Sequence, residues 1–272
     1  NITSWNTAAV TNMTGMFRTA RVFNQNINTS GNIWNVSNVT NMSRMFQDNY
    51  VFNGNITGWN TVAVTTMKEM FSEARVFNQN ISSWNTAAVT RMDYMFNGAS
   101  AFNQPLVHSG NTWNLGNVTI MTNMFYNAGL SIANYNVFLY SQANNSGTNS
   151  NININVSSKY SDATSRTFLT GTKNWTITDL GASSDFVSTW AIPSNSYNFE
   201  LPLKDYANIT INWGDGSSNT SSTDSNMKSH TYTSAGTYTI TVTVNDAATK
   251  DIGEMYMNGT HASRTLIRTI TN

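Results

Sequence analysis

The sequence lacks cysteine and has few charged residues. None of its 272 residues is cysteine, so neither a disulfide framework nor a thiolate metal site can form, and packing and backbone pairing must stabilise the fold. Charged residues make up 10% of the chain and balance to a net charge of zero, which excludes the basic field that binds nucleic acid or acidic lipid. No apolar run approaches the roughly 18 residues of a membrane span. We therefore expect no nucleic-acid partner and no membrane span in this chain.

Asparagine, serine and threonine take the polar positions that lysine and glutamate fill in a typical cytosolic protein. This composition indicates an uncharged, heavily hydrogen-bonded surface, which is frequent among secreted and surface proteins. We therefore expect an extracellular location, with the protein secreted by a bacterium or held on its surface.

An internal repeat is the strongest pattern in the chain. Five tryptophans recur at spacings of 29, 25, 25 and 29 residues: Trp5, Trp34, Trp59, Trp84 and Trp113. Eight residues after each tryptophan stands a methionine, and three residues later a second methionine is followed at once by phenylalanine. The first four copies then have Phe-Asn six residues further on, whereas the fifth has Ser131 there. A degenerate last copy is typical of a solenoid's terminal repeat, so residues 1–131 are predicted to form a solenoid of five repeats.

Each repeat of about 25 residues is predicted to contain one strand and one short helix. The strand is expected around the pattern I-x-x-W. The helix is expected over V-T-x-M-x-x-M-F, because Val10, Met13, Met16 and Phe17 follow the spacing of one helical face. Stacked coils would then place tryptophan on tryptophan and methionine on methionine along one core, which a single coil could not bury alone.

Two features of the repeat have both a functional and a structural interpretation. The methionine stripe is compatible with a metal site or an adaptable binding groove, but burial in the core is favoured because phenylalanine stands beside it at helical spacing. The repeated F-N-Q-N, first seen at 23–26, is compatible with a polar ladder that binds sugars. Pairing of the asparagines with the backbone of neighbouring coils is favoured.

Residues 5–27, W-N-T-A-A-V-T-N-M-T-G-M-F-R-T-A-R-V-F-N-Q-N-I, resemble the BspA-type leucine-rich-repeat surface proteins, also known as the DUF285 family. Residues 132–135 and 174–179 resemble the cap of such solenoids, which places a cap at 132–184. The resemblance implies an extracellular leucine-rich-repeat-like solenoid and, for some members, adhesion. It carries no binding residue over to this chain.

A second domain is predicted at 185–247, where runs of alternating polarity replace the methionine repeat. The sequences W-G-D-G at 213–216 and H-T-Y-T-S-A-G-T-Y at 230–238 resemble the PKD domain, which implies an all-β immunoglobulin-like sandwich that serves as a spacer or contact module. The predicted fold class is thus α+β. Asp215 could act as a metal ligand or general acid with His230 as its partner, but we favour an aspartate that fixes its own turn and a histidine that packs at a strand start.

Catalytic machinery is not indicated. The three histidines, His108, His230 and His261, lie in unrelated segments. The phosphate-binding loop, the HExxH zinc motif, the GxSxG nucleophile elbow and the EF-hand calcium loop are all missing from the sequence. We therefore predict a protein that is not an enzyme and that uses no cofactor and no metal.

The two ends suggest how copies could join. The chain opens in register at 2–5 with no capping unit in front, whereas residues 248–272 form a strand-like segment without a domain of its own. In proteins of the family it resembles, a PKD-like module and a similar segment precede the solenoid. We therefore expect 248–272 to cap the solenoid of the next copy. The candidate contact comprises Ile2 and Trp5 of one copy with Leu266, Ile267 and Ile270 of its neighbour. The alternative is that the segment folds back on its own sandwich.

Two functions follow from this organisation. The first is a non-enzymatic structural repeat protein, a protomer or tandem unit of a surface filament or array whose copies bind head to tail. The second is a cell-surface adhesin that binds host protein or glycan through the solenoid. An exposed apolar or aromatic patch outside the repeat core would favour the adhesin.

Overall fold

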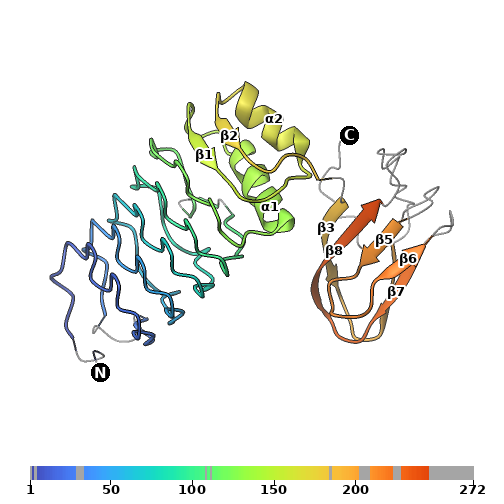
Figure 1. The fold of residues 1–272 in the computed structure, drawn as a ribbon, viewed down its shortest axis with the longest axis horizontal. Helices are drawn as coiled ribbons and strands as arrows, with labels where there is room; N and C mark the ends of the chain where they lie inside the picture. The colour runs from blue at the N-terminus through green and yellow to red at the C-terminus, as the bar shows by residue number, and fades with distance from the viewer. Residues whose placement is uncertain are drawn as a thin grey trace. The chain divides into compact units, whose positions relative to one another are not determined.

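The computed structural model describes residues 2, 5–28, 34–107, 109–110, 112–183, 186–201, 209–222 and 228–244. The chain divides into two compact units, Asn1–Gly181 and Ala182–Asn272. The first unit is a stack of coils followed by two helices and two short strands, and the second consists of β-strands (Figure 1). Among the described residues, no helix is both long enough and apolar enough to traverse a lipid bilayer.

Backbone hydrogen bonds join successive coils, which begin at the five repeated tryptophans and are numbered coils 1 to 5. The amides of Arg44 and Phe46 in coil 2 donate to the carbonyls of Lys68 and Met70 in coil 3 at 2.8 and 2.9 Å. Parallel bridges run through all five coils in one register: Asn12–Asn41, Asn41–Thr66, Thr66–Arg91 and Arg91–Ile120. The coils therefore stack in one register, and backbone hydrogen bonds pair each coil with the next.

The prediction of a strand and a helix in every repeat is wrong. The described residues between 5 and 131 form turns and isolated bridges, with no helix or extended strand. In coil 2 the amide of Met45 donates to the carbonyl of Met42, and the amide of Asn49 donates to Phe46. The third residues of these turns, Arg44 and Asp48, have φ of 60° and 56°. Left-handed residues interrupt a helix, and they turn every second amide toward the neighbouring coil.

The I-x-x-W segment likewise forms a turn in place of the expected strand. The amide of Trp59 donates to the carbonyl of Ile56 at 3.2 Å, and the same turn recurs at Trp84 with Ile81. Each indole then reaches the coil before it. The Trp59 Nε1 donates to the carbonyl of Ile27 at 2.8 Å, so the one polar atom of a buried tryptophan is satisfied.

The interior of the coils is a set of aromatic columns. Phe71 stacks on Phe46 at 5.5 Å and on Phe96 at 5.7 Å, with interplanar angles of 3° and 4°. Trp59 and Trp84 stack as a pair, with centroids 6.0 Å apart and an angle of 6°. The paired methionines of coils 2 to 5 have no exposed surface. The favoured interpretation of the methionine stripe as core is therefore confirmed.

An asparagine ladder lines one edge of the coils. The amide of Asn78 donates to Oδ1 of Asn53 at 2.9 Å, and the amide of Asn103 donates to Oδ1 of Asn78 at the same distance. Asn24 accepts from the amide of Asn53 in the same way at 2.7 Å. The expected pairing of the F-N-Q-N asparagines with neighbouring backbone is thereby confirmed, since these oxygens are already occupied by the protein.

The last coil continues into helices and strands: α1 (Ile132–Ala143), β1 (Asn153–Asn155), α2 (Ala163–Gly171) and β2 (Thr176–Thr178). Phe125 of coil 5 forms a parallel bridge with Val156 directly after β1, and β1 pairs in parallel with β2. Ser131 caps α1 by accepting from the amide of Asn134. The ring of Phe138 on α1 meets Phe125 edge-on at 5.3 Å. These elements cover the core at the coil 5 end of the unit (Figure 1).

The second unit is built from antiparallel strands: β3 (Phe186–Ile192), β4 (Tyr197–Leu201), β5 (Ile209–Asn212), β6 (Thr220–Ser222), β7 (Lys228–Tyr232) and β8 (Gly236–Val244). One sheet has the order β3-β8-β5-β6, and β4 and β7 form a second. Trp213, Tyr232 and Ile240 are buried in a core of their own. The predicted α+β class is confirmed, and this antiparallel unit is consistent with a PKD-like β domain.

Candidate functional site

The structure places two of the five predicted contact residues. Ile2 packs against the core of the first unit, and Trp5 is 48% exposed. Leu266, Ile267 and Ile270 lie outside the described residues. The predicted meeting of the two groups therefore stays a prediction.

Trp5 lies in coil 1 and is the most exposed of the five repeated tryptophans. Its ring stacks on Trp34 at 6.3 Å, and its other face meets no aromatic ring among the described residues. The tryptophans at the same position of coils 2 to 5 are between 0% and 3% exposed. The carbonyl of Ile2 accepts from Nε1 of Trp34 at 3.0 Å and from the amide of Trp5 at 3.1 Å. The carbonyl of Ile2 therefore accepts from the indole of Trp34 as the carbonyl of Ile27 accepts from the indole of Trp59.

Backbone acceptors also lie on coil 1. In the register of the stack, the amides of Gly15 and Phe17 donate to coil 2, so the carbonyls of Thr14 and Met16 turn away from it. No described residue donates a hydrogen bond to these two carbonyls. An exposed indole beside a row of free carbonyls can bind a segment that offers backbone N–H groups and an apolar side chain.

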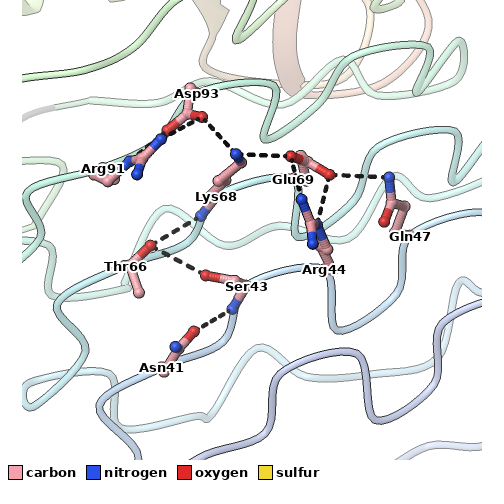
Figure 2. A network of polar contacts seen from close by, with 9 residues as sticks. All are labelled: Asn41, Ser43, Arg44, Gln47, Thr66, Lys68, Glu69, Arg91 and Asp93. Carbon is pink, nitrogen blue, oxygen red and sulfur yellow. Dashed lines mark hydrogen bonds and ion pairs between the residues drawn. The ribbon is translucent and has the colours of Figure 1, made fainter.

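A charged network crosses the surface of coils 2 to 4 (Figure 2). Arg44 donates to Glu69 through Nε at 2.8 Å and Nη2 at 3.2 Å. Lys68 bridges the two carboxylates, with Nζ at 3.1 Å from Glu69 and 3.6 Å from Asp93. Arg91 binds both oxygens of Asp93 at 3.0 Å. Three cations therefore hold two carboxylates in fixed positions.

This network is suited to structure and not to acid–base chemistry. Burial opposes ionisation of Glu69, but hydrogen bonds from Arg44 and Lys68 outweigh it and hold the Glu69 pKa below its ordinary value. A carboxylate kept ionised in this way cannot serve as a general acid near neutral pH. Among the described residues, no group of three or more histidine, aspartate or glutamate side chains could hold a metal ion.

Sequence reasoning missed this network, although a signal for it was present. The two residues between the paired methionines are Ser43-Arg44, Lys68-Glu69 and Asp93-Tyr94 in coils 2 to 4. In stacked coils these positions are neighbours, so charges of opposite sign in one register predict cross-coil ion pairs.

In the second unit, Asp215 and His230 do come together. Oδ2 of Asp215 accepts from Nε2 of His230 at 2.7 Å, and Oδ1 accepts from the hydroxyl and the amide of Ser217 at 2.6 and 3.0 Å. The histidine ring stacks on Trp213 at 5.0 Å. Because Ser217 donates to the aspartate and not to the histidine, no base faces the hydroxyl as it would in a catalytic triad. The favoured structural role of Asp215 agrees with this geometry.

Replacing Asp215 with asparagine is expected to destabilise the second unit by about 2 kcal/mol at pH 7. Burial raises the Asp215 pKa, but hydrogen bonds from Ser217 and His230 outweigh it and lower the pKa to about 2 from 3.8. A carboxylate whose pKa is depressed by folding stabilises the fold above its unfolded pKa, and this stabilisation is lost as the pH falls through the folded pKa. Thermal unfolding of both proteins should therefore show a difference that shrinks between pH 5 and pH 2. A difference that stays constant over this range would contradict the assignment.

Two family models match the chain. Residues 1–63, 28–138 and 51–163 match the family described as Mycoplasma protein of unknown function, DUF285, and residues 182–251 match the PKD domain. No curated protein and no solved structure matches the chain. The first family covers the coils, α1 and β1, and the second covers the strands of the second unit. Neither description names an enzymatic activity.

Proposed function

The chain belongs to the DUF285 family and carries a PKD domain, and on this premise we propose that it is a non-enzymatic extracellular structural protein whose copies bind head to tail. The coils would then be a solenoid of the leucine-rich-repeat type in which turns replace the strand and helix. The copies form a surface filament or array, either as separate protomers or as units of one tandem chain. A composition with only 10% charged residues and rich in asparagine, serine and threonine supports the extracellular location.

The exposed indole of Trp5 is the observation that carries this proposal. Trp5 is 48% exposed, whereas the tryptophans at the same position of coils 2 to 5 are almost fully buried. An apolar layer stacked on Trp5 and Ile2 would bury the exposed part of the indole, and the free carbonyls beside them would accept backbone amides. The apolar residues Leu266, Ile267 and Ile270 of a neighbouring copy are the proposed layer. A contact that joins two different surfaces does not close on itself and so produces an open filament.

Electron microscopy and sedimentation of the full chain test this function. We expect filaments or concentration-dependent oligomers, which are lost when residues 248–272 are removed and when Trp5 is replaced by serine. Leu180→Ser is the matched control, because Leu180 is also an exposed apolar residue, at 62%, but follows β2 at the covered end of the first unit. A full chain that remains monomeric at high micromolar concentration would contradict head-to-tail binding.

A second candidate, the adhesin, is favoured by one observation. Tyr94 in coil 4 and Tyr126 in coil 5 are 38% and 47% exposed, and no charged residue occurs from 94 to 158. Exposed aromatic rings on coils rich in asparagine suit an uncharged glycan, because the rings can stack on sugar faces while asparagine amides donate and accept hydrogen bonds. Loss of binding to a glycan array in the double variant Y94A/Y126A, with self-association unchanged, would support this function over the structural one.

A further inference from the structure

The charged network of coils 2 to 4 exposes its cations more than its carboxylates. The side chains of Arg44, Lys68 and Arg91 are 43%, 28% and 42% exposed, whereas those of Glu69 and Asp93 are 15% and 5% exposed. The energy between two charges falls with their separation, so an approaching ligand interacts more strongly with the outer cations than with the covered carboxylates. This part of the surface therefore attracts anions, although the net charge of the whole chain is zero.

Both arginines of the network keep one edge of the guanidinium group for a partner. Arg44 binds Glu69 through Nε and Nη2, and Arg91 binds Asp93 through the same two atoms. A guanidinium group has five N–H donors, and no described residue accepts a hydrogen bond from Nη1 of either arginine. Each arginine can therefore donate two further hydrogen bonds to an anion without releasing its own carboxylate.

The ion pairs also fix these cations in position. Bidentate pairing holds each guanidinium plane in one orientation, and Lys68 lies between the two pairs, with Nζ 3.1 Å from Glu69 and 3.6 Å from Asp93 (Figure 2). A side chain that is already fixed loses less conformational entropy on binding than a free one. The three cations are therefore pre-organised for a ligand.

The spacing of the cations favours a polymer over a small anion. Coils joined by backbone hydrogen bonds lie about 5 Å apart, so Arg44 in coil 2 and Arg91 in coil 4 stand on coils about 10 Å apart. A single carboxylate or sulfate group cannot reach both guanidinium groups over this distance. A linear polymer with anionic groups on successive units can contact Arg44, Lys68 and Arg91 at once.

The polar groups among the cations suit a sugar. The hydroxyls of Ser43 and Thr66 lie 3.1 Å apart, and the amide of Gln47 donates to Glu69 at 3.0 Å. Hydroxyl and amide groups form hydrogen bonds with sugar hydroxyls, and the arginine fork binds the carboxylate or sulfate groups that acidic sugars carry. None of the residues drawn in Figure 2 is aromatic, so the network offers no ring on which a nucleic-acid base could stack.

We propose that Arg44, Lys68 and Arg91 bind an acidic polysaccharide, one that carries carboxylate or sulfate groups on successive sugars. This site does not depend on head-to-tail binding. It also differs from the surface of Tyr94 and Tyr126 in coils 4 and 5, which suits an uncharged glycan. The contacts are made by charges that are partly exposed, so binding weakens as the salt concentration rises.

Two substitutions with opposite expected effects test this site on the full chain. Arg44→Gln removes an outer cation and leaves Glu69 in contact with Lys68, so the Kd for alginate, a polymer of uronic acids, should rise about tenfold. Glu69→Gln removes a covered carboxylate and makes the local charge more positive, so the same Kd should fall about threefold. Biolayer interferometry at low and high salt measures both, with alginate, chondroitin sulfate and neutral dextran as immobilised probes.

Arg75→Gln is the matched control. Arg75 is also paired with a carboxylate, but it and Glu73 are both exposed, at 59% and 36%, and neither belongs to the network. The same substitution here should leave the Kd for alginate within about twofold of the wild-type value. A Kd that rises as much in Arg75→Gln as in Arg44→Gln would overturn the assignment to the network.

Thermal unfolding of each variant separates lost binding from lost folding. A Kd that rises in both Arg44→Gln and Glu69→Gln, with lower thermal stability in both, would mean that the network only holds the coils together, and would overturn the site. A wild-type chain that binds neither alginate nor chondroitin sulfate at low salt would overturn it as well. Tighter binding to single-stranded DNA than to either polysaccharide would contradict the assigned ligand class.

Discussion

Replacing Phe71 with alanine is expected to lower the free energy of unfolding of the first unit by about 3–5 kcal/mol. Phe71 has no exposed surface and lies at the crossing of two sets of contacts. Along the stack its ring meets those of Phe46 and Phe96. Within its own coil, its ring centroid lies 3.8 Å from that of Phe77. The columns are continuous, so a cavity here removes packing from the coils on both sides. Chemical denaturation followed by circular dichroism measures the loss.

Phe168→Ala is the matched control for this prediction. Phe168 lies on α2 and is 36% exposed, so the same change of side chain should cost less than about 1 kcal/mol. Because each coil contacts only its neighbours, unfolding of the Phe71 variant should also become less cooperative, with a second transition as the two halves of the stack separate. A loss below about 1 kcal/mol for Phe71→Ala would show that the aromatic columns do not hold the coils together.

The core of the coils could be predicted from the sequence, but its backbone could not. Tryptophan, methionine and phenylalanine at fixed positions in five copies identify the buried residues, because only a stacked repeat buries the same position every time. The spacing of Met13, Met16 and Phe17 is shared by a helix and by consecutive four-residue turns. The difference lies in Gly15 and its counterparts Arg44 and Glu69, which all have positive φ. Only the glycine indicates a positive φ in the sequence, because arginine and glutamate rarely adopt it and do so here under the constraint of the stack.

The candidate site was accessible to sequence reasoning only where residues repeat in register. Ile2 and Trp5 could be named because later coils show what normally precedes and follows them. The cross-coil pair of Arg44 with Glu69 required knowledge that positions 25 residues apart are neighbours on the surface. The greater exposure of Arg44 than of Glu69 depended on a further fact, namely which way each side chain points from its turn. Turns do not alternate as strands do, so this fact could not be read from a period of two.

The second large effect is expected at Asp179, where replacement with alanine should destabilise the first unit by about 3–5 kcal/mol. Its side chain is 3% exposed and accepts from Nε of Arg166 at 2.8 Å, from the hydroxyl of Tyr135 at 3.0 Å and from the amide of Gly181 at 3.2 Å. Burial, followed by the charge of Asp179, raises the Tyr135 pKa well above its usual value, so this hydroxyl stays protonated as a donor. Alanine leaves the donors of Arg166 and Tyr135 without their acceptor in a covered site.

Two comparisons identify the cause of this loss. Glu73→Ala removes a carboxylate from an arginine at the surface, where Glu73 and Arg75 are 36% and 59% exposed, and should cost no more than about 1 kcal/mol. The double variant Arg166→Met with Asp179→Ala removes both charges, and it should recover part of the stability lost in Asp179→Ala because no buried cation is left unpaired. Thermal and urea unfolding of these variants gives the coupling directly. One outcome is that the double variant loses as much stability as the single variants Arg166→Met and Asp179→Ala lose together. That result would mean that the carboxylate acts through Tyr135 and Gly181, and not through the ion pair.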